Sequence, residues 1–182
     1  MKGIIFNLLE KAVTAEHGAD VWDTLLERAG ADGSYTSLGS YSDAELVRLV
    51  EAASALTGRS ASEILRWFGT AAMPMLHGRY PEFFDAHTDC GSFLRSLNDV
   101  IHAEVRKLYP GAEVPSFSFE APEENRLIVV YRSRKQLCAL AEGMIEGSAR
   151  QFGQDVRIEH PRCTHRGDDA CHLDCRFGPS SA

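Results

Sequence analysis

The sequence lacks the excess of basic residues that nucleic-acid-binding domains usually carry. Its 182 residues include 19 Lys and Arg against 26 Asp and Glu, which gives a formal net charge of -7. Such a chain has no overall positive field to attract a phosphate backbone or an anionic membrane. The apolar N-terminal run ends at Glu10 and Lys11, far short of the roughly 20 residues of a membrane-spanning helix, and no small-residue cleavage site follows. We therefore expect a cytoplasmic protein that binds neither nucleic acid nor membrane.

Motifs of common hydrolytic and phosphate-transferring enzymes are also missing. The sequence contains no Gly-x-Ser-x-Gly nucleophile segment, no Walker loop and no His-Glu-x-x-His helix. Its adjacent carboxylates, Glu123 and Glu124, look like part of a turn. We therefore expect no catalytic activity from this chain.

The pattern of apolar residues predicts a single α+β domain. Helical spacing dominates residues 1–110, whereas period-two alternation after Pro115 predicts hairpins at 117–132 and 156–177, separated by a helix at about 135–149. We expect one domain over residues 1–182. It would comprise a helical subdomain at 1–110, a subdomain with an antiparallel sheet and helices at 111–178, and a tail at 179–182.

Helix boundaries in the first part follow from capping and breaking residues. Capping boxes at 42–45 and 60–63 predict two helix starts. Gly58 is expected to end the first of these helices, and Pro74 to kink or end the second. A further helix is predicted over residues 92–109, ended by the Pro-Gly pair that follows it.

His102 lies on this last helix, beside an apolar stripe. The stripe consists of Leu94, Leu97, Ile101, Val105 and Leu108. Helical spacing alone describes His102 as a boundary residue. Alternation in the later strand, however, places Tyr131 and Ser133 on one face, and Lys135 continues that face if the strand does not end earlier. An imidazole can ligate iron, and two hydroxyls with a cation suit haem propionates, so the combination suggests a haem pocket rather than a solvated basic strand end.

Cysteine and histidine gather near the C-terminus. Five cysteines is an odd number, and in a reducing compartment the mixture with histidine favours a metal over disulfides. Three thiolates and one imidazole, a set suited to tetrahedral zinc, would come from Cys138, His160, Cys163 and Cys171. The competing ligands are Cys175, which shares a strand face with Cys171, and His165 and His172. Free thiols are the alternative, and Cys90 is expected to pack in the core.

Over almost its whole length, the sequence resembles the H-NOX family of haem-based nitric oxide and oxygen sensors, also found in soluble guanylate cyclase. The resemblance rests on the Met-Lys-Gly-Ile-Ile-Phe start, Leu-Asn-Asp-Val-Ile-His at 97–102, Leu-Tyr-Pro at 108–110, Pro115 and Tyr131-x-Ser133. It implies that haem b lies between the two subdomains and that His102 is the axial ligand of its iron. It also implies that Tyr131 and Ser133 hydrogen-bond the propionates and that Pro115 packs against the macrocycle.

Lys135 is a departure from the family motif, which has an arginine at this position. Lysine keeps the positive charge but not the bidentate fork of a guanidinium. We expect Lys135 to meet a propionate, and Arg134 could replace it only if the strand twists.

The gas that the resemblance implies depends on a missing residue. Oxygen-binding members carry a distal tyrosine on the helix after the motif, whereas this chain has aliphatic side chains on both facing helices. We assign Ile5, Leu140 and Met144 to this distal wall. Nitric oxide and CO need no hydroxyl donor, so we expect a nitric oxide sensor that forms no stable oxygen complex. Binding of the gas is expected to release His102 and the helix that carries it.

Signalling is expected to pass to a separate protein, because no output domain follows residue 177. Stand-alone bacterial members of the family imply a histidine kinase or a cyclic-di-GMP enzyme as this partner. A bacterial subset also carries a zinc site at the four positions named above, which favours that ligand set. The alternative function is a zinc-stabilised thiol-redox or apolar-ligand binding module without haem.

Overall fold

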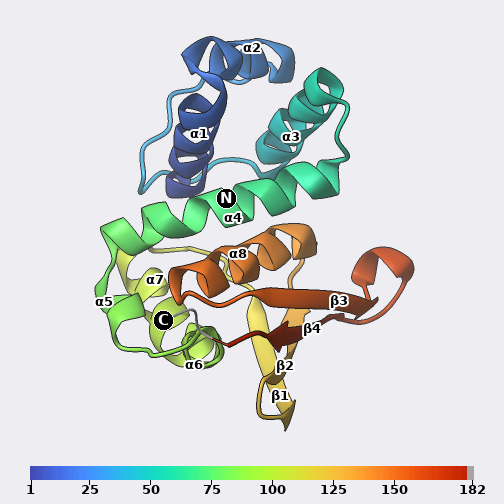
Figure 1. Ribbon diagram of the computed structural model, residues 1–182. Coiled ribbons are helices and arrows are strands. Elements are labelled where there is room, and N and C mark those ends of the chain that lie inside the picture. The colour runs from blue at the N-terminus through green and yellow to red at the C-terminus, as the bar shows by residue number, and fades with distance from the viewer. Residues whose placement is uncertain (180–182) are drawn as a thin grey trace.

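The computed structural model describes residues 1–179 and shows helices stacked on a four-stranded antiparallel sheet (Figure 1). The first helices are α1 (Gly3–His17), α2 (Ala19–Ala29), α3 (Asp43–Thr57) and α4 (Ala61–Arg79). Next come α5 (Glu82–Asp85), α6 (Cys90–Arg95), the π-helical turn η1 (Leu97–Ile101) and α7 (His102–Leu108). The remainder comprises β1 (Ser116–Glu123), β2 (Arg126–Arg132), α8 (Cys138–Gln151), β3 (Val156–Arg162), the short turn η2 (Thr164–Arg166) and β4 (Cys171–Phe177). The predicted α+β architecture is confirmed, and of the predicted tail all but Pro179 lies outside the described residues.

The sheet joins the two predicted hairpins edge to edge. Its strand order is β1-β2-β4-β3, and every neighbouring pair is antiparallel. Both hairpins form as predicted, but the pairing of β2 with β4 was not anticipated. Because this register sets Tyr131 opposite Cys171, it brings the candidate haem residues close to the cysteine cluster.

The α8 helix lies on the sheet, and α4 crosses directly over α8 (Figure 1). Glycines permit this close approach, since a Cβ atom on Gly143 would overlap the Arg66 carbonyl of α4. The apolar core is continuous through these layers. One cluster fills the space between α1, α2, α3 and α4, and a second joins α4 and α6 to α8 and the sheet, with Cys90 buried inside it.

One of the two predicted capping boxes is complete. The Ser60 hydroxyl accepts a hydrogen bond from the N–H group of Glu63, whose carboxylate accepts one in return from the N–H group of Ser60. The box at 42–45 is wrong, because the Ser42 side chain accepts only from Ala44. The Glu45 carboxylate instead accepts a hydrogen bond of 2.6 Å from the hydroxyl of Tyr35.

The interior of α4 also differs from expectation. Pro74 does not end this helix, which continues to Arg79. Pro74 has no N–H group, so the helical hydrogen bond to the carbonyl of Thr70, four residues earlier, is missing. That carbonyl instead lies against Gly147 of α8. By contrast, Gly58 ends α3 as predicted, in the left-handed conformation with φ 73°.

The single helix predicted over 92–109 is wrong, because the chain forms α6, η1 and α7 there instead. The Asn98 side chain is hydrogen-bonded to the backbone of Phe117 on β1, donating to its carbonyl at 2.6 Å and accepting from its N–H group at 3.1 Å. These two hydrogen bonds attach the π turn to β1. Such π turns often occur at functional sites. The next predicted helix starts later than expected, at Cys138, because Gln136 adopts a positive φ of 51°.

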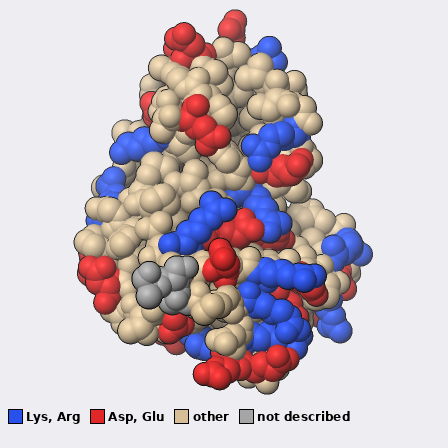
Figure 2. Space-filling model, viewed as in Figure 1, with Lys and Arg blue, Asp and Glu red and all other residues tan. Residues whose placement is uncertain are grey.

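The surface carries interleaved charges of both signs (Figure 2). Arginines of the sheet pair with neighbouring carboxylates, as Arg126 does with Asp174 at 2.6 Å and with Glu123 at 2.9 Å. Among residues 1–179, no helix is both long and apolar enough to cross a membrane.

Candidate functional site

A large apolar cavity lies between the helical layer and the sheet. Its volume is about 510 Å³, within the range of roughly 300–1,000 Å³ typical of small-molecule and cofactor sites. Its apolar walls include Ile4, Ile5 and Leu8 of α1, Met73 and Leu76 of α4, and Leu140, Ala141, Met144 and Ile145 of α8. The predicted apolar stripe around His102 lines the same cavity.

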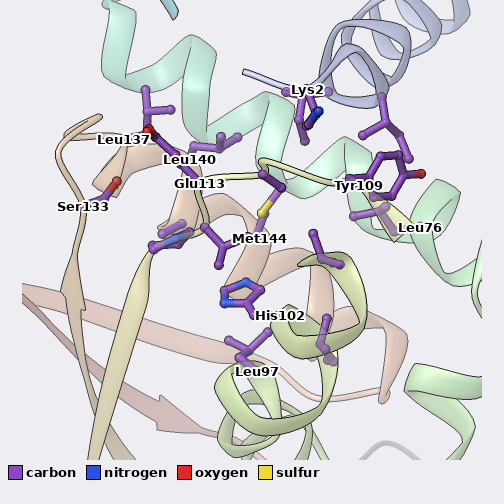
Figure 3. Close-up of a pocket in the computed structure, with 18 of the residues that line it drawn as sticks. Lys2, Leu76, Leu97, His102, Tyr109, Glu113, Ser133, Leu137, Leu140 and Met144 are labelled. Carbon is purple, nitrogen blue, oxygen red and sulfur yellow. The ribbon is translucent and has the colours of Figure 1, made fainter. Parts of the chain in front are cut away.

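His102 contributes its imidazole ring to this cavity (Figure 3). Its Nδ1 atom is buried and has no hydrogen-bond partner. Burial lowers the pKa of His102 to about 4, and the positive charge of Arg106 lowers it as well, whereas the Pro115 carbonyl acts weakly in the opposite direction. The ring is therefore neutral at pH 7, which is the form that can ligate a metal.

Two hydroxyl groups predicted to face a ligand also line the cavity. The Tyr131 hydroxyl accepts a hydrogen bond from the N–H group of Leu137 at 3.2 Å, and the Ser133 hydroxyl accepts one from the N–H group of Lys135 at 3.2 Å. The strand β2 ends at Arg132, so Ser133 and Lys135 both lie beyond the strand whose alternation predicted their common face with Tyr131.

Lys135 nevertheless lines the cavity, whereas Arg134 is exposed and does not. The Lys135 ammonium lies 2.5 Å from the carboxylate of Asp43 and 3.5 Å from that of Glu113. Sequence reasoning missed both carboxylates. The sequence pattern indicates Asp43 only as part of a helix start, and no sequence motif links it to residue 135.

The remaining predicted pocket residues, Pro115 and Ile5, also line the cavity, as do Leu140 and Met144 (Figure 3). The arrangement fits haem, because it offers a neutral imidazole for iron, apolar walls for a macrocycle, and hydroxyl and ammonium groups for carboxylates. Sequence reasoning missed another pair of hydroxyls, on Tyr80 and Tyr109, which lie 2.6 Å apart and join the end of α4 to the residue after α7.

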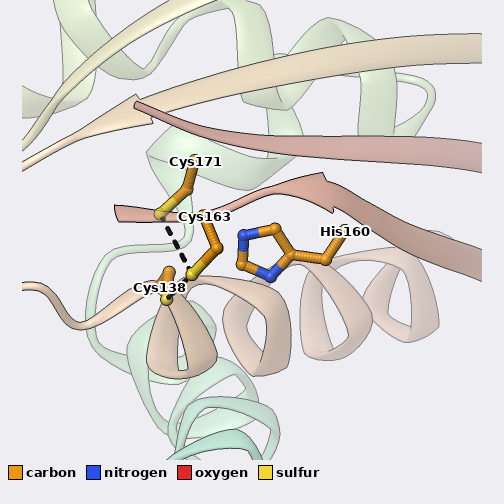
Figure 4. Close-up of side chains that lie close together, drawn as sticks. All are labelled: Cys138, His160, Cys163 and Cys171. Carbon is orange, nitrogen blue, oxygen red and sulfur yellow. Dashed lines mark hydrogen bonds between the residues drawn. The ribbon is translucent and has the colours of Figure 1, made fainter. Parts of the chain in front are cut away.

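The predicted zinc ligands lie together beside the sheet (Figure 4). One ligand atom each of Cys138, His160, Cys163 and Cys171 falls within 4.8 Å of all the others. The Sγ atom of Cys163 is 3.8 Å from that of Cys138 and 3.8 Å from that of Cys171. A tetrahedron with metal–sulfur bonds of about 2.3 Å has edges of about 3.8 Å, so these two sulfur–sulfur distances are those that zinc requires.

Hydrogen bonds stabilise one thiolate of this cluster. Burial raises the pKa of Cys171, but the hydroxyl and N–H groups of Thr164 outweigh it and lower the pKa below its usual range. The pKa of Cys138 is raised by burial and by the neighbouring thiolates. Since zinc binds the thiolate form, a bound cation would offset this repulsion.

The three competing ligands lie away from this group. Cys175 shares a strand face with Cys171 but is buried among Val129 and Leu173 in the main core. Nε2 of His165 is hydrogen-bonded to the carbonyl of Gln136 at 2.8 Å, and His172 is not among the clustered side chains.

Comparisons with known proteins agree with the cavity and the fold. The family model described as Haem-NO-binding matches residues 2–160. The structure of an H-NOX protein from S. oneidensis in the Fe(II)NO ligation state superposes with a TM-score of 0.92 at 35% identity, covering 98% of this chain and 100% of that one. The Fe(II) unliganded H-NOX protein from K. algicida gives 0.89 at 26% identity, covering 100% and 99%.

A curated relative is much longer than this chain. Soluble guanylate cyclase 89Da of Drosophila melanogaster is 27% identical over 165 residues, which are 84% of this chain but only 23% of that protein. The similarity is thus confined to about a quarter of the cyclase. The match over residues 2–160 and the full-length likeness to bacterial proteins show that the chain belongs to the H-NOX family of haem-binding gas-sensor domains.

Proposed function

We propose that this chain binds haem b through His102 and senses nitric oxide. The observation that carries the proposal is a neutral imidazole, with a buried Nδ1 atom that has no hydrogen-bond partner, lining an apolar cavity of about 510 Å³. Haem would supply the ferrous iron at which the gas binds. Carbon monoxide is a second expected ligand, since a related H-NOX domain from Shewanella oneidensis has been solved in the Fe(II)CO ligation state.

Tyr131, Ser133 and Lys135 would hold the propionates, and Pro115 would pack against the macrocycle. All four residues line the cavity, which supports these roles. Lys135 would offer the propionates a single ammonium, which the carboxylates of Asp43 and Glu113 already contact. We therefore assign the hydrogen bonds from the two hydroxyls the larger part in orienting the propionates.

Selectivity for nitric oxide over oxygen would follow from the aliphatic wall of Ile5, Leu140 and Met144. Several hydroxyls that line the cavity are already engaged, since Ser148 donates to the carbonyl of Met144 at 2.7 Å and Tyr109 pairs with Tyr80. Bound oxygen is polar and gains from a hydrogen-bond donor, whose loss in a dry site costs about 1–3 kcal/mol. Nitric oxide lacks this requirement.

The signal would begin with release of His102 and of α7. Neither η1 nor α7 contains a buried residue, and Asn98 is the side chain that ties them to β1. A segment without fully buried side chains can respond to ligation as a two-state element. The resulting movement would shift the helical half against the sheet half.

A separate effector, either a histidine kinase or a cyclic-di-GMP enzyme, is our proposal for the partner. The similarity to the Drosophila cyclase covers only 23% of that protein. This supports the assignment of the chain as a sensor that acts on a separate effector. Co-purification with candidate effectors in the presence and absence of nitric oxide would test this assignment.

The decisive experiment compares His102→Gly with His87→Gly after expression with haem available. His87 lies between α5 and α6 and does not line the cavity. We expect the wild type and His87→Gly to show a Soret band and a ferrous spectrum that changes with nitric oxide but persists in air. His102→Gly should lose haem, or keep it in a state resembling the released form. An unchanged nitric oxide response in His102→Gly would contradict the proposal, as would a stable oxygen spectrum of the wild type.

We further propose that Cys138, His160, Cys163 and Cys171 bind zinc, which would tie α8 to β3 and β4. The sulfur spacing of 3.8 Å supports this assignment. Oxidation of the thiolates would expel the metal and could act as a second, redox input. Metal analysis of reduced, freshly purified protein should return stoichiometric zinc, and its absence would exclude the site.

The alternative of a module without haem loses its support, because the family binds haem.

A further inference from the structure

Glu142 is a buried carboxylate that makes direct contact with the metal cluster. It follows Cys138 by four residues on α8, so the two side chains lie on the same face of the helix. Only 9% of the residue is exposed. One carboxylate oxygen, Oε1, lies 2.5 Å from Nδ1 of His160. A carboxylate this deeply buried needs strong partners, because removing it from water is costly.

This contact leaves the other ring nitrogen of His160 directed at the thiolates. Nε2 is buried and has no hydrogen-bond partner. In Figure 4 one ring nitrogen points toward Cys163 and Cys171, while the other points toward α8. The two nitrogens therefore have different tasks, one held by Glu142 and the other free to donate its lone pair.

Glu142 is itself held in place from α4. Its second oxygen accepts a hydrogen bond of 3.1 Å from Nη1 of Arg66, and Nη2 of the same guanidinium lies 2.5 Å from Glu146. The guanidinium thus binds two carboxylates that are one helical turn apart. A continuous polar chain runs from Arg66 through Glu142 to the ring that faces the cysteines.

We propose that Glu142 is the positioning residue of the Cys3His metal site and that Arg66 anchors it. By accepting the Nδ1 proton, Glu142 fixes the tautomer in which Nε2 carries the lone pair and holds the ring toward the three sulfurs. Carboxylate partners of ligating histidines act in this way and typically contribute 10- to 100-fold to metal affinity. This proposal rests on the metal site proposed above, and it extends that site from β3 and α8 to α4.

The test measures zinc affinity of the full-length protein by competition with a chromophoric chelator. Glu142→Ala should bind zinc about 10- to 100-fold more weakly than the wild type. Glu142→Gln retains an acceptor oxygen and should show a smaller loss. Glu146→Ala is the matched control, because it removes the other partner of Arg66 but leaves the contacts of Glu142 with Arg66 and His160 in place, and it should lose much less zinc affinity than Glu142→Ala.

A second measurement separates positioning from simple stability. Cobalt(II) loaded in place of zinc reports its ligand set through its d–d bands, which should change in Glu142→Ala and match the wild type in Glu146→Ala. Wild-type zinc affinity in both Glu142 variants would overturn the proposal, as would an equal loss in Glu146→Ala. A wild-type protein that binds no zinc would overturn the metal site itself, whereas zinc binding that does not depend on Glu142 would overturn only the positioning role.

Discussion

Lys135 and Asp43, which both line the cavity, form an ion pair that joins the loop before α8 to the first residue of α3. The ammonium is largely buried, with 14% of the side chain exposed, whereas 44% of the Asp43 side chain is exposed. Glu113, in the segment between α7 and β1, adds a longer contact to the same ammonium. Three chain segments therefore meet at Lys135.

This pair should contribute modestly to stability. A double-mutant cycle of Lys135→Met and Asp43→Asn at pH 7, followed by urea unfolding, should give a coupling free energy of about 1 kcal/mol, because solvent screens a half-exposed carboxylate. Lys107→Met is the control, since 70% of that side chain is exposed in its pair with Glu104, and it should change little. Zero coupling between Lys135 and Asp43 would show that the pair contributes nothing.

The same pair predicts a pH dependence. Burial raises the pKa of Asp43, but hydrogen bonds from Lys135 and the N-terminal ammonium outweigh it and lower the pKa below its ordinary value. A lowered pKa in the folded state means that the contribution is fully present above the unfolded-state pKa of about 3.9 and is lost as the pH falls through the folded-state value. The stability difference between wild type and Asp43→Asn should therefore be constant from pH 5 to 7 and shrink below about pH 4. A difference that grows on acidification would contradict this assignment.

Gly143 should be intolerant of any side chain. A Cβ atom there would overlap the Arg66 carbonyl, which is backbone and cannot rotate away, so α4 and α8 would have to separate. We expect Gly143→Ala to lower the free energy of unfolding by about 1–3 kcal/mol and to change the Soret band, since both helices line the cavity. Gly78→Ala is the matched control on α4, because nothing lies within 4 Å of its Cβ position, and it should be neutral or slightly stabilising. Equal stability of the two variants would show that the helices can part at little cost.

Residue type and local spacing accounted for much of this architecture. The hairpins and the helical first half follow from short-range patterns that a sequence displays directly, whereas the set of Cys138, Cys163 and Cys171 was favoured over its competitors only by the family resemblance. The residues chosen for the haem pocket also meet at one cavity, although helical spacing alone would have dismissed His102.

Long-range pairings could not be predicted in this way. The tie between η1 and β1 requires Asn98 to meet Phe117, and the metal-site chain requires Arg66 to meet Glu142 from 76 residues away. Such contacts are set by how layers stack, and neither propensity nor periodicity encodes them. The placement of Lys135 is a further case, because its partner Asp43 lies on a different layer.

Asn98 should control how firmly the His102 segment is attached to the sheet. Asn98→Ala removes both hydrogen bonds to Phe117 and leaves a partly buried N–H and carbonyl without partners, which costs about 1–3 kcal/mol. Amide hydrogen exchange should therefore accelerate across residues 97–108. Asp99→Ala, at the exposed neighbouring position, should leave exchange unchanged. Equal protection in the two variants would mean that the π turn does not depend on this clamp.

Leu140 offers the most direct test of gas selectivity. Leu140→Tyr would add a hydroxyl donor to the aliphatic wall of the cavity. A hydrogen bond of about 1–3 kcal/mol corresponds to oxygen dissociation that is roughly 5- to 150-fold slower, measurable by stopped-flow spectroscopy of the ferrous protein. Leu140→Phe supplies the same ring without the hydroxyl, so it separates the donor from the added volume and should retain wild-type behaviour in air. If both variants hold oxygen equally, cavity shape rather than the missing donor determines selectivity.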